Sequence, residues 1–202
     1  MVIELLSKPD LRQWALENRR ALSGNHILRM SERIADNLKK VKEFRCARHV
    51  LTCLSFDNEI DTWQLANDLA AAPDRQVYVP RVDTDGIMRV HPYPCKLRTL
   101  RMGLRQPELE ESEVPRERVD AMLDVALVLG LAFERPRGYR LGQGKGYFDR
   151  FLHGRPFCVI GLSMECFLID RFPVEPHDIP MGLIVTEERV YRYENKLKEN
   201  LR

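Results

Sequence analysis

The run RLGQGKGYFDR at residues 140–150 has residue types and spacing that could do chemistry. Three glycines at alternate positions let backbone N–H groups approach a bulky anion, and positive φ costs little there. Arg140 and Lys145 bracket this stretch with positive charge, and Asp149 follows with an oxygen ligand suited to Mg²⁺. The pattern favours a phosphate-binding loop with a metal-binding carboxylate. A flexible turn is the competing interpretation, which these residues alone leave open.

This glycine run matches neither of the familiar nucleotide-binding loops. A Walker A loop needs Ser or Thr after its lysine, but Gly146 follows Lys145. The dinucleotide pattern GxGxxG fails because Tyr147 stands where the last glycine belongs. A nucleotide site built on this run must therefore be of another type.

Composition limits the class of protein. A chain of 202 residues predicts one domain over residues 1–202, which can bury roughly 70% of its unfolded surface. The content of 44% hydrophobic and 31% charged residues is typical of a globular protein. The net charge of +2, from 32 basic and 30 acidic residues, is too balanced to indicate nucleic acid as a partner.

No apolar run approaches the length of roughly 18 residues that a membrane span needs, so we expect no membrane partner. The first eight residues lack the features of a signal peptide, which favours a cytoplasmic protein. The five cysteines are odd in number and include no C-x-x-C pair, so we expect reduced thiols and no zinc site.

Capping signals and helical spacing predict two helices at the start of the chain. Ser7 and Pro9 are typical of a helix start, and the first helix should run to about Leu22. Apolar residues at helical spacing predict a second helix over about 25–41. A β-rich run at 49–56 predicts the first strand.

The middle of the chain shows further elements. Asp61 and Gln64 predict a reciprocally capped helix start. A second strand is expected over 76–79, stopped by Pro80, and a possible third over 87–90.

The continuous apolar run Asp124–Leu129 is typical of a central parallel strand, and it leads toward the glycine run. A short helix over about 147–153 and strands over 157–162 and 183–185 complete the pattern. Alternating helices and strands predict a three-layer α/β fold, a mostly parallel sheet with helices on both faces. In such sheets ligands bind beyond the carboxyl ends of the strands.

The run R-L-G-x-G-x-G-Y-[YF]-D-R closely resembles the signature of the 5-formyltetrahydrofolate cyclo-ligases, also called 5,10-methenyltetrahydrofolate synthetases. The resemblance extends over nearly the whole chain, because four other regions match the family in order. These regions are Lys8–Ser23, Ser55–Thr62, Val79–Val82 and the C-terminal segments Pro173–Pro180 and Val185–Glu187.

The resemblance implies an enzyme that uses ATP and Mg²⁺ to close the ring of 5-formyltetrahydrofolate to 5,10-methenyltetrahydrofolate, releasing ADP and phosphate. It also implies a fold shared with certain sugar-phosphate isomerases and CoA transferases. Lys145 and Arg140 are then the expected catalytic cations, since phosphoryl transfer needs its developing charge neutralised. The segments that match the family's nucleotide site give the expected ATP-binding residues: Lys8, Arg12, Arg140, Leu141, Gly142, Gln143, Gly144, Lys145, Gly146, Tyr147 and Phe148.

Asp149 and Asp178 match the family's Mg²⁺ ligands, although helix-dipole and turn roles would also explain them. The expected folate-binding residues are Leu54, Phe56, Glu59 and Tyr147. Glu59 is chosen because Asp61 and Gln64 already account for helix capping, which leaves its carboxylate for the pterin. An exposed loop glutamate is the plainer explanation of the same residue.

The chain departs from the family pattern at several positions, among them one in the segment Gly130–Phe133, where a preceding proline is usual. Gln106 stands where a glutamate is usual, Phe167 replaces a late glutamine, and Gln143 replaces an aromatic residue or methionine in the glycine run. None of these changes removes a phosphate- or metal-binding group. Gln106 and Phe167 leave open how the folate is contacted.

Two other functions stay open. A sugar-phosphate isomerase or CoA transferase could use the same fold, with Glu59 as the only tempting carboxylate nucleophile. A folate-binding or regulatory relative would bind folate without turning over ATP. We expect 5-formyltetrahydrofolate and ATP as the partners of a monomer.

Overall fold

A computed structural model describes residues 7–193 of the chain. The helices are α1 (Lys8–Arg20), α2 (Gly24–Lys40), α3 (Lys42–Cys46), α4 (Trp63–Ala71), α5 (Arg116–Met122) and α6 (Tyr147–Leu152). The strands are β1 (His49–Thr52), β2 (Gln76–Val82), β3 (Met88–Tyr93), β4 (Leu97–Thr99), β5 (Arg105–Pro107), β6 (Val125–Leu129), β7 (Ala132–Glu134), β8 (Arg140–Leu141), β9 (Cys158–Leu162), β10 (Leu168–Ile169), β11 (Leu183–Val185) and β12 (Val190–Arg192).

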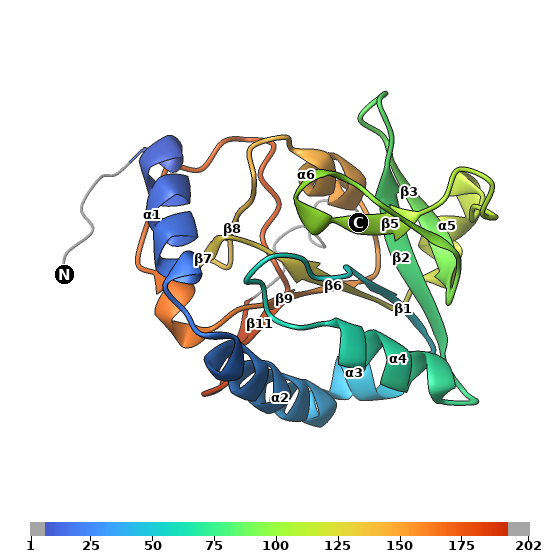
Figure 1. The fold of residues 1–202 in the computed structure, drawn as a ribbon, viewed down its shortest axis with the longest axis horizontal. Coiled ribbons are helices and arrows are strands. Elements are labelled where there is room, and N and C mark those ends of the chain that lie inside the picture. Colours follow the sequence, from blue (N-terminus) through green and yellow to red (C-terminus); the bar gives the residue numbers. More distant parts are fainter. Residues whose placement is uncertain (1–6, 194–202) are drawn as a thin grey trace, which may run out of the picture.

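Within the described residues the main sheet has seven strands in the order β12-β11-β9-β6-β1-β2-β3 (Figure 1). The inner strands from β11 to β2 are parallel, and antiparallel β12 and β3 form the two edges. The predicted α/β fold with a mostly parallel sheet is confirmed. The run predicted as the central strand is β6, which lies in the middle of the order.

Side chains on β6 alternate between two cores, which shows that helices cover both faces of the sheet. Val125 and Leu127 pack in a cluster with residues of α1, α2, α3 and α4. Ala126 and Val128 pack on the other face with residues of α5 and α6. These strand residues are at most 1% exposed, which explains why the run is continuously apolar.

Helix α1 begins as predicted and presents its cations on one face. The Ser7 hydroxyl accepts the Asp10 N–H at 3.4 Å, and Pro9 occupies the first turn. The helix ends at Arg20, slightly before the predicted Leu22. Lys8, Arg12 and Arg19 follow one helix face because their spacings of four and seven residues are close to whole turns.

Two local predictions in the first half are wrong. Pro80 does not stop β2, which continues to Val82 and pairs there with β3. The register of β1 ends at Tyr78, so Pro80 lies where β2 has only one partner strand, a position that tolerates a missing N–H. Gln64 does not complete a reciprocal cap: its amide donates to Asp68, while Asp61 accepts the Trp63 N–H at 2.8 Å.

A small sheet separates β6 from the glycine run. Strands β7 and β8 form an antiparallel pair, and β10 adds to β7 in parallel. The sequence gives no signal for these elements, because strands of two or three residues carry too little periodicity. They carry Arg140 and Leu141 back to the end of β6, where Leu131 donates its N–H to Leu141 at 2.8 Å.

Among residues 7–193, no helix is both long enough and apolar enough to cross a bilayer.

Candidate active site

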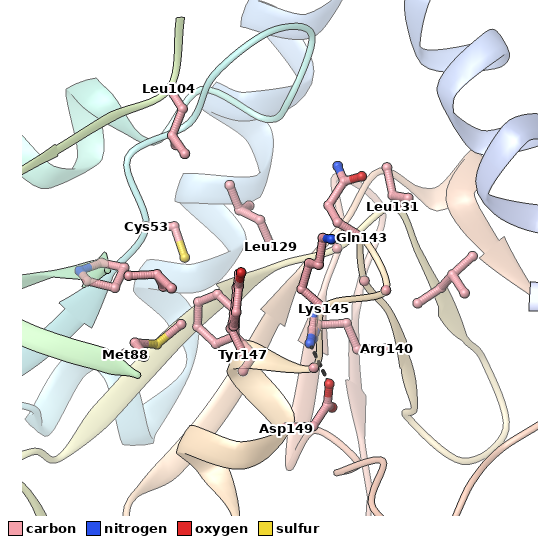
Figure 2. Close-up of a pocket in the computed structure, with 18 of the residues that line it drawn as sticks. Cys53, Met88, Leu104, Leu129, Leu131, Arg140, Gln143, Lys145, Tyr147 and Asp149 are labelled. Carbon is pink, nitrogen blue, oxygen red and sulfur yellow. Dashed lines mark hydrogen bonds and ion pairs between the residues drawn. The ribbon is translucent and has the colours of Figure 1, made fainter. Parts of the chain in front are cut away.

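A cavity of about 720 Å³ opens at the carboxyl ends of β1, β2 and β6. Helix α1 and the glycine run border one side, and the β4–β5 hairpin borders another (Figure 1). Figure 2 shows Arg140, Lys145 and Asp149 together at one side of the pocket, well separated from Cys53, Met88 and Leu104. The cavity therefore lies where the fold class predicts a ligand.

Every site residue predicted from the sequence lines this one cavity, although these residues come from four separate segments of the chain. Lys8 and Arg12 come from α1, the Leu54–Glu59 loop follows β1, and Asp178 lies in the C-terminal segment. The roles of these residues remain predictions, but the structure brings all of them to the same pocket.

The glycine run needs its glycines for two different reasons. A Cβ at Gly142 would lie 2.4 Å from a guanidinium nitrogen of Arg140, so a larger residue there would make the Arg140 side chain move. Gly144 has φ +87°, which L side chains rarely adopt, and its Cβ would lie 3.2 Å from the Arg12 guanidinium. Arg12 also donates from Nε to the Gly142 carbonyl at 2.9 Å, so α1 and the run hold each other in place.

The cations of this side differ in their partners. Lys8 Nζ lies 2.6 Å from Asp178 Oδ2, and Arg140 Nη2 lies 3.2 Å from Asp149 Oδ2. Lys145 is exposed and forms no ion pair with any residue in the range 7–193. The glycine run therefore carries one accessible, unpaired ammonium group beside two cations that are already neutralised.

Arg140 is buried, and burial lowers its pKa while the charges of Asp149 and Asp178 oppose that shift. Both aspartates are therefore near the same guanidinium. Its Nε donor has no hydrogen-bond partner among the described residues. A buried donor without a partner is costly.

The nominated metal ligands lie on the same side. Asp178 also accepts the Glu175 N–H at 2.7 Å, and its ligand atom lies within 4.8 Å of those of Glu175 and His177. Asp149 is outside that group, and its Oδ1 accepts the Ile179 N–H at 3.5 Å. Carboxylate oxygens beside a phosphate-binding loop fit a hard divalent cation such as Mg²⁺.

Glu59 has partners within the protein. The prediction that its carboxylate is left free for a ligand, because Asp61 and Gln64 cap the next helix, is therefore wrong. Its Oε1 lies 3.4 Å from Arg19 Nη1, and its Oε2 accepts the Phe56 N–H at 3.2 Å. Burial raises the pKa of Glu59, and the positive charge of Arg19 opposes this. Arg19 is also not a surface residue, since it is 7% exposed.

Comparisons with known proteins identify the family of this chain. A family model described as the 5-formyltetrahydrofolate cyclo-ligase family matches residues 5–187. The chain belongs to that family.

Individual relatives cover most of the chain. The 5-formyltetrahydrofolate cyclo-ligase of Escherichia coli (strain K12) is 31% identical over 189 residues, which are 88% of this chain and 98% of that protein. The NMR structure of Aquifex aeolicus 5,10-methenyltetrahydrofolate synthetase superposes with a TM-score of 0.78 at 29% identity and covers 93% of both chains. A Mycoplasma pneumoniae 5,10-methenyltetrahydrofolate synthetase, at 20% identity and a TM-score of 0.69, supports the fold alone.

The part of the cavity away from the glycine run is lined mostly by apolar side chains. Leu54 is buried and Phe56 is half-buried in the pocket wall. Tyr147 lies with its ring 5.4 Å below the Arg150 guanidinium, between the glycine run and Met88 (Figure 2). Phe148 packs partly against the core and stacks under Arg140 at 5.2 Å.

Sequence reasoning missed the wall that the β2–β5 region contributes. Met88, Leu100, Leu104 and Arg105 line the cavity, and the Arg105 guanidinium lies 5.3 Å over the Trp63 ring. Residues 87–118 carry prolines among charges and give no clear periodicity. The pairing of β2 with β3 and of β4 with β5 brings these residues to the pocket.

The departures from the cyclo-ligase pattern separate into two cases. Gln106 is buried in the pocket wall, and its amide pairs with both the N–H and the carbonyl of Val82 at 3.3 Å. Phe167 lies outside the main cavity, packed edge-on against Trp14. Gln106 therefore has a structural role in the wall, and Phe167 does not line the main pocket.

Proposed function

We propose that this protein catalyses the ATP- and Mg²⁺-dependent conversion of 5-formyltetrahydrofolate to 5,10-methenyltetrahydrofolate. The observation that carries the proposal is the convergence of Lys8, Arg12, Arg140 and Lys145 around the glycine run, in the same cavity as the Glu59 carboxylate. Cations beside a glycine-rich backbone suit a triphosphate, and a buried carboxylate in an apolar wall suits the donor edge of a pterin. Membership of the cyclo-ligase family supports the pairing of these two ligands.

The formyl group on N5 is an amide, so its oxygen is a poor leaving group. The formyl oxygen attacks the γ-phosphorus of ATP, the bond to the bridging oxygen breaks, and ADP leaves. N10 of the same folate then attacks the activated carbon, loses its proton, and phosphate departs with the former formyl oxygen. N10 is held beside that carbon by the folate itself, so ring closure gains from proximity.

In this reaction the residues of the chain mainly align the two substrates and neutralise the negative charge of the phosphates. Lys145, which forms no ion pair within residues 7–193, is the cation placed to meet the transferred phosphoryl group. Backbone N–H groups around Gly144 contribute further donors, and Arg12 fixes their positions through Gly142. Such preorganised charge is the main source of rate in phosphoryl transfer.

Asp149 and Asp178 would hold Mg²⁺, which supplies charge neutralisation at the phosphates when bound. In the structure these carboxylates pair with Arg140 and Lys8. Binding of the metal to the carboxylates and of phosphate oxygens to the cations would replace two internal ion pairs with four contacts to the ligands.

A CoA transferase is disfavoured by the surroundings of Glu59. A nucleophilic carboxylate must be accessible and free to attack, whereas both oxygens of Glu59 have partners and its side chain is 12% exposed. The folate-binding alternative stays testable because it shares the pocket and differs only in turnover.

The test is an absorbance assay for the methenyl chromophore with purified protein, 5-formyltetrahydrofolate and Mg²⁺, with and without ATP. We expect the chromophore to form only when ATP is present, together with stoichiometric ADP. Folate binding without chromophore formation would identify a relative that does not turn over and would refute the proposed reaction.

A further inference from the structure

A largely buried ion pair lies directly behind the wall of the pocket on the folate side. Arg19 Nη1 lies 3.4 Å from Glu59 Oε1, and Arg19 Nη2 donates to the Gly130 carbonyl at 2.6 Å. The Arg19 guanidinium also lies 5.8 Å over the ring of Phe167. Three neighbours from different segments thus fix this one guanidinium.

Arg19 and Glu59 are placed differently with respect to the main cavity. Glu59 lines both the 720 Å³ cavity and a small one behind it, whereas Arg19 lines only the small one. The small cavity has a volume of about 10 Å³, at the lower limit for a single water molecule. Arg19 therefore contacts Glu59 from the rear and does not border the space that a substrate would fill.

The ionisation of Glu59 depends on a small number of charges. Burial is the largest influence and raises its pKa, and Asp57 in the same loop raises it further. Arg19 from α1 is the positive charge that opposes both. Cys53 is the other titratable neighbour, and burial raises the pKa of its thiol to about 12, so it stays neutral and does not offset the loss of Arg19.

We propose that Arg19 is a positioning residue that holds the Glu59 carboxylate ionised and aimed into the pocket, so that it can accept hydrogen bonds from the folate. This inference rests on the proposed function in taking folate as the ligand of Glu59. Arg19 shares its helix face with Lys8 and Arg12, so one face of α1 supports both the phosphate side and the folate side.

The sign of the expected pH effect follows from these charges. Without Arg19, the hydrogen bond from the Phe56 N–H still lowers the pKa of Glu59, but the opposing charge against burial and Asp57 is lost. The carboxyl of Glu59 therefore takes up a proton at higher pH than in the wild type. A protonated carboxyl loses acceptor capacity toward the pterin N–H groups. Folate binding by Arg19→Met should therefore weaken as pH falls, by at most about tenfold for each pH unit.

The experiment measures the Kd of 5-formyltetrahydrofolate by calorimetry without ATP, over a range of about pH 5.5 to 8.5. Wild type, Arg19→Met, Arg19→Lys and the control Arg20→Met are compared, and thermal unfolding checks that each variant folds. Arg20 is exposed on the same helix, so its loss should leave Kd and its pH profile unchanged. Arg19→Lys keeps the charge and should recover most of the wild-type pH profile, even if Arg19→Met folds poorly.

A double-mutant cycle separates positioning from general stability. Glu59→Gln should bind folate weakly at every pH, because the group that titrates is gone. Adding Arg19→Met to Glu59→Gln should cause no further loss of folate affinity if Arg19 acts through Glu59. Additive losses, or a wild-type pH profile in Arg19→Met, would overturn the inference.

The outcomes distinguish this inference from the proposed function. If the wild type binds folate with the expected response to Arg19 but forms no methenyl product, the inference stands and the reaction is wrong. If the wild type turns over while Arg19→Met keeps the wild-type pH profile of Kd, the reaction stands and the inference is wrong. If the wild type binds no folate at all, both are overturned.

Discussion

The two sides of the pocket are built in different ways. The phosphate side is centred on a contiguous glycine run, in which Gly144 and Lys145 are exposed and Gly144 has a positive φ. Lys8, Arg12 and Asp178 join this run from other segments. The folate side consists of side chains from distant segments, with Glu59 and Arg19 paired across forty positions and largely withdrawn from solvent. On the phosphate side, the local conformation of the glycine run leaves the charge of Lys145 exposed. On the folate side, packing between distant segments shields the charges of Arg19 and Glu59 from solvent.

This difference predicts that substitutions on the two sides affect different kinetic quantities. Changes in the glycine run should alter nucleotide affinity, metal dependence or turnover. Changes around Glu59 should alter folate affinity and its pH dependence. A variant that affects both sides equally would break the comparison.

The largest effect is expected for Lys145→Ala. Loss of the unpaired ammonium group should lower kcat at least ~10²-fold, because one preorganised charge in a phosphoryl-transfer site has about that effect. Saturating chromophore assays measure kcat, and Lys39→Ala, an exposed change on α2, is the matched control. A wild-type kcat in Lys145→Ala would remove this residue from the proposed mechanism.

Asp149→Asn should raise the Mg²⁺ concentration needed for half-maximal activity roughly 10–100-fold, since a metal-binding carboxylate is lost. Binding of a non-hydrolysable ATP analogue should show the same shift in its Mg²⁺ dependence, which gives a readout independent of turnover. Asp74→Asn, exposed and remote from the pocket, should leave both unchanged. An unchanged requirement in Asp149→Asn would exclude this carboxylate as a ligand.

On the folate side, Glu59→Gln should raise KM for 5-formyltetrahydrofolate about 10-fold, in line with losing a hydrogen bond to a charged group. KM for ATP should change much less, because Glu59 pairs with Arg19 and Phe56 and not with the glycine run. The ratio of the two KM values decides the prediction. Equal increases would mean that the two sides are not separable.

Gly144→Ala tests whether the phosphate side needs the backbone conformation of its glycine run. A Cβ at φ +87° strains the backbone, and the resulting loss of affinity for an ATP analogue should be about 5-fold. Gly24→Ala is the control, since a Cβ there meets nothing within 4 Å. Folate affinity should be unchanged in both variants. If Gly144→Ala binds the analogue like wild type, the run does not need its left-handed geometry.

The same contrast explains which parts could be predicted from sequence. Helix α1, strand β6 and the glycine run were predictable because their signals are local: a Ser7 cap, a continuous apolar run, and glycines at alternate positions. All nominated pocket residues were found through these signals and the family motifs. The conformational demand at Gly144 is visible in the residue type itself.

The rest depends on tertiary contacts. Pro80 continues a strand because its neighbour β1 has already ended, which no local pattern reveals. Gln106 replaces a usual glutamate and yet pairs with the Val82 backbone, and Arg105 reaches the pocket through the β4–β5 pairing. The Arg19–Glu59 pair joins two segments forty positions apart, which no local pattern in the sequence reveals.

The smallest effect is expected for the labelling of Cys53, which tests whether solvent reaches the folate side of the pocket. Cys53 borders the pocket, and burial raises the pKa of its thiol to about 12, so the reactive thiolate is scarce at neutral pH and rises about tenfold per pH unit up to that value. Iodoacetamide at pH 8 should therefore label exposed Cys46 rapidly and Cys53 very little, as peptide mass spectrometry would show. Labelling of Cys53 as fast as Cys46 would mean that water reaches the folate side freely. The protection of Glu59 by Arg19 would then lose its electrostatic basis, because solvent would screen the pair.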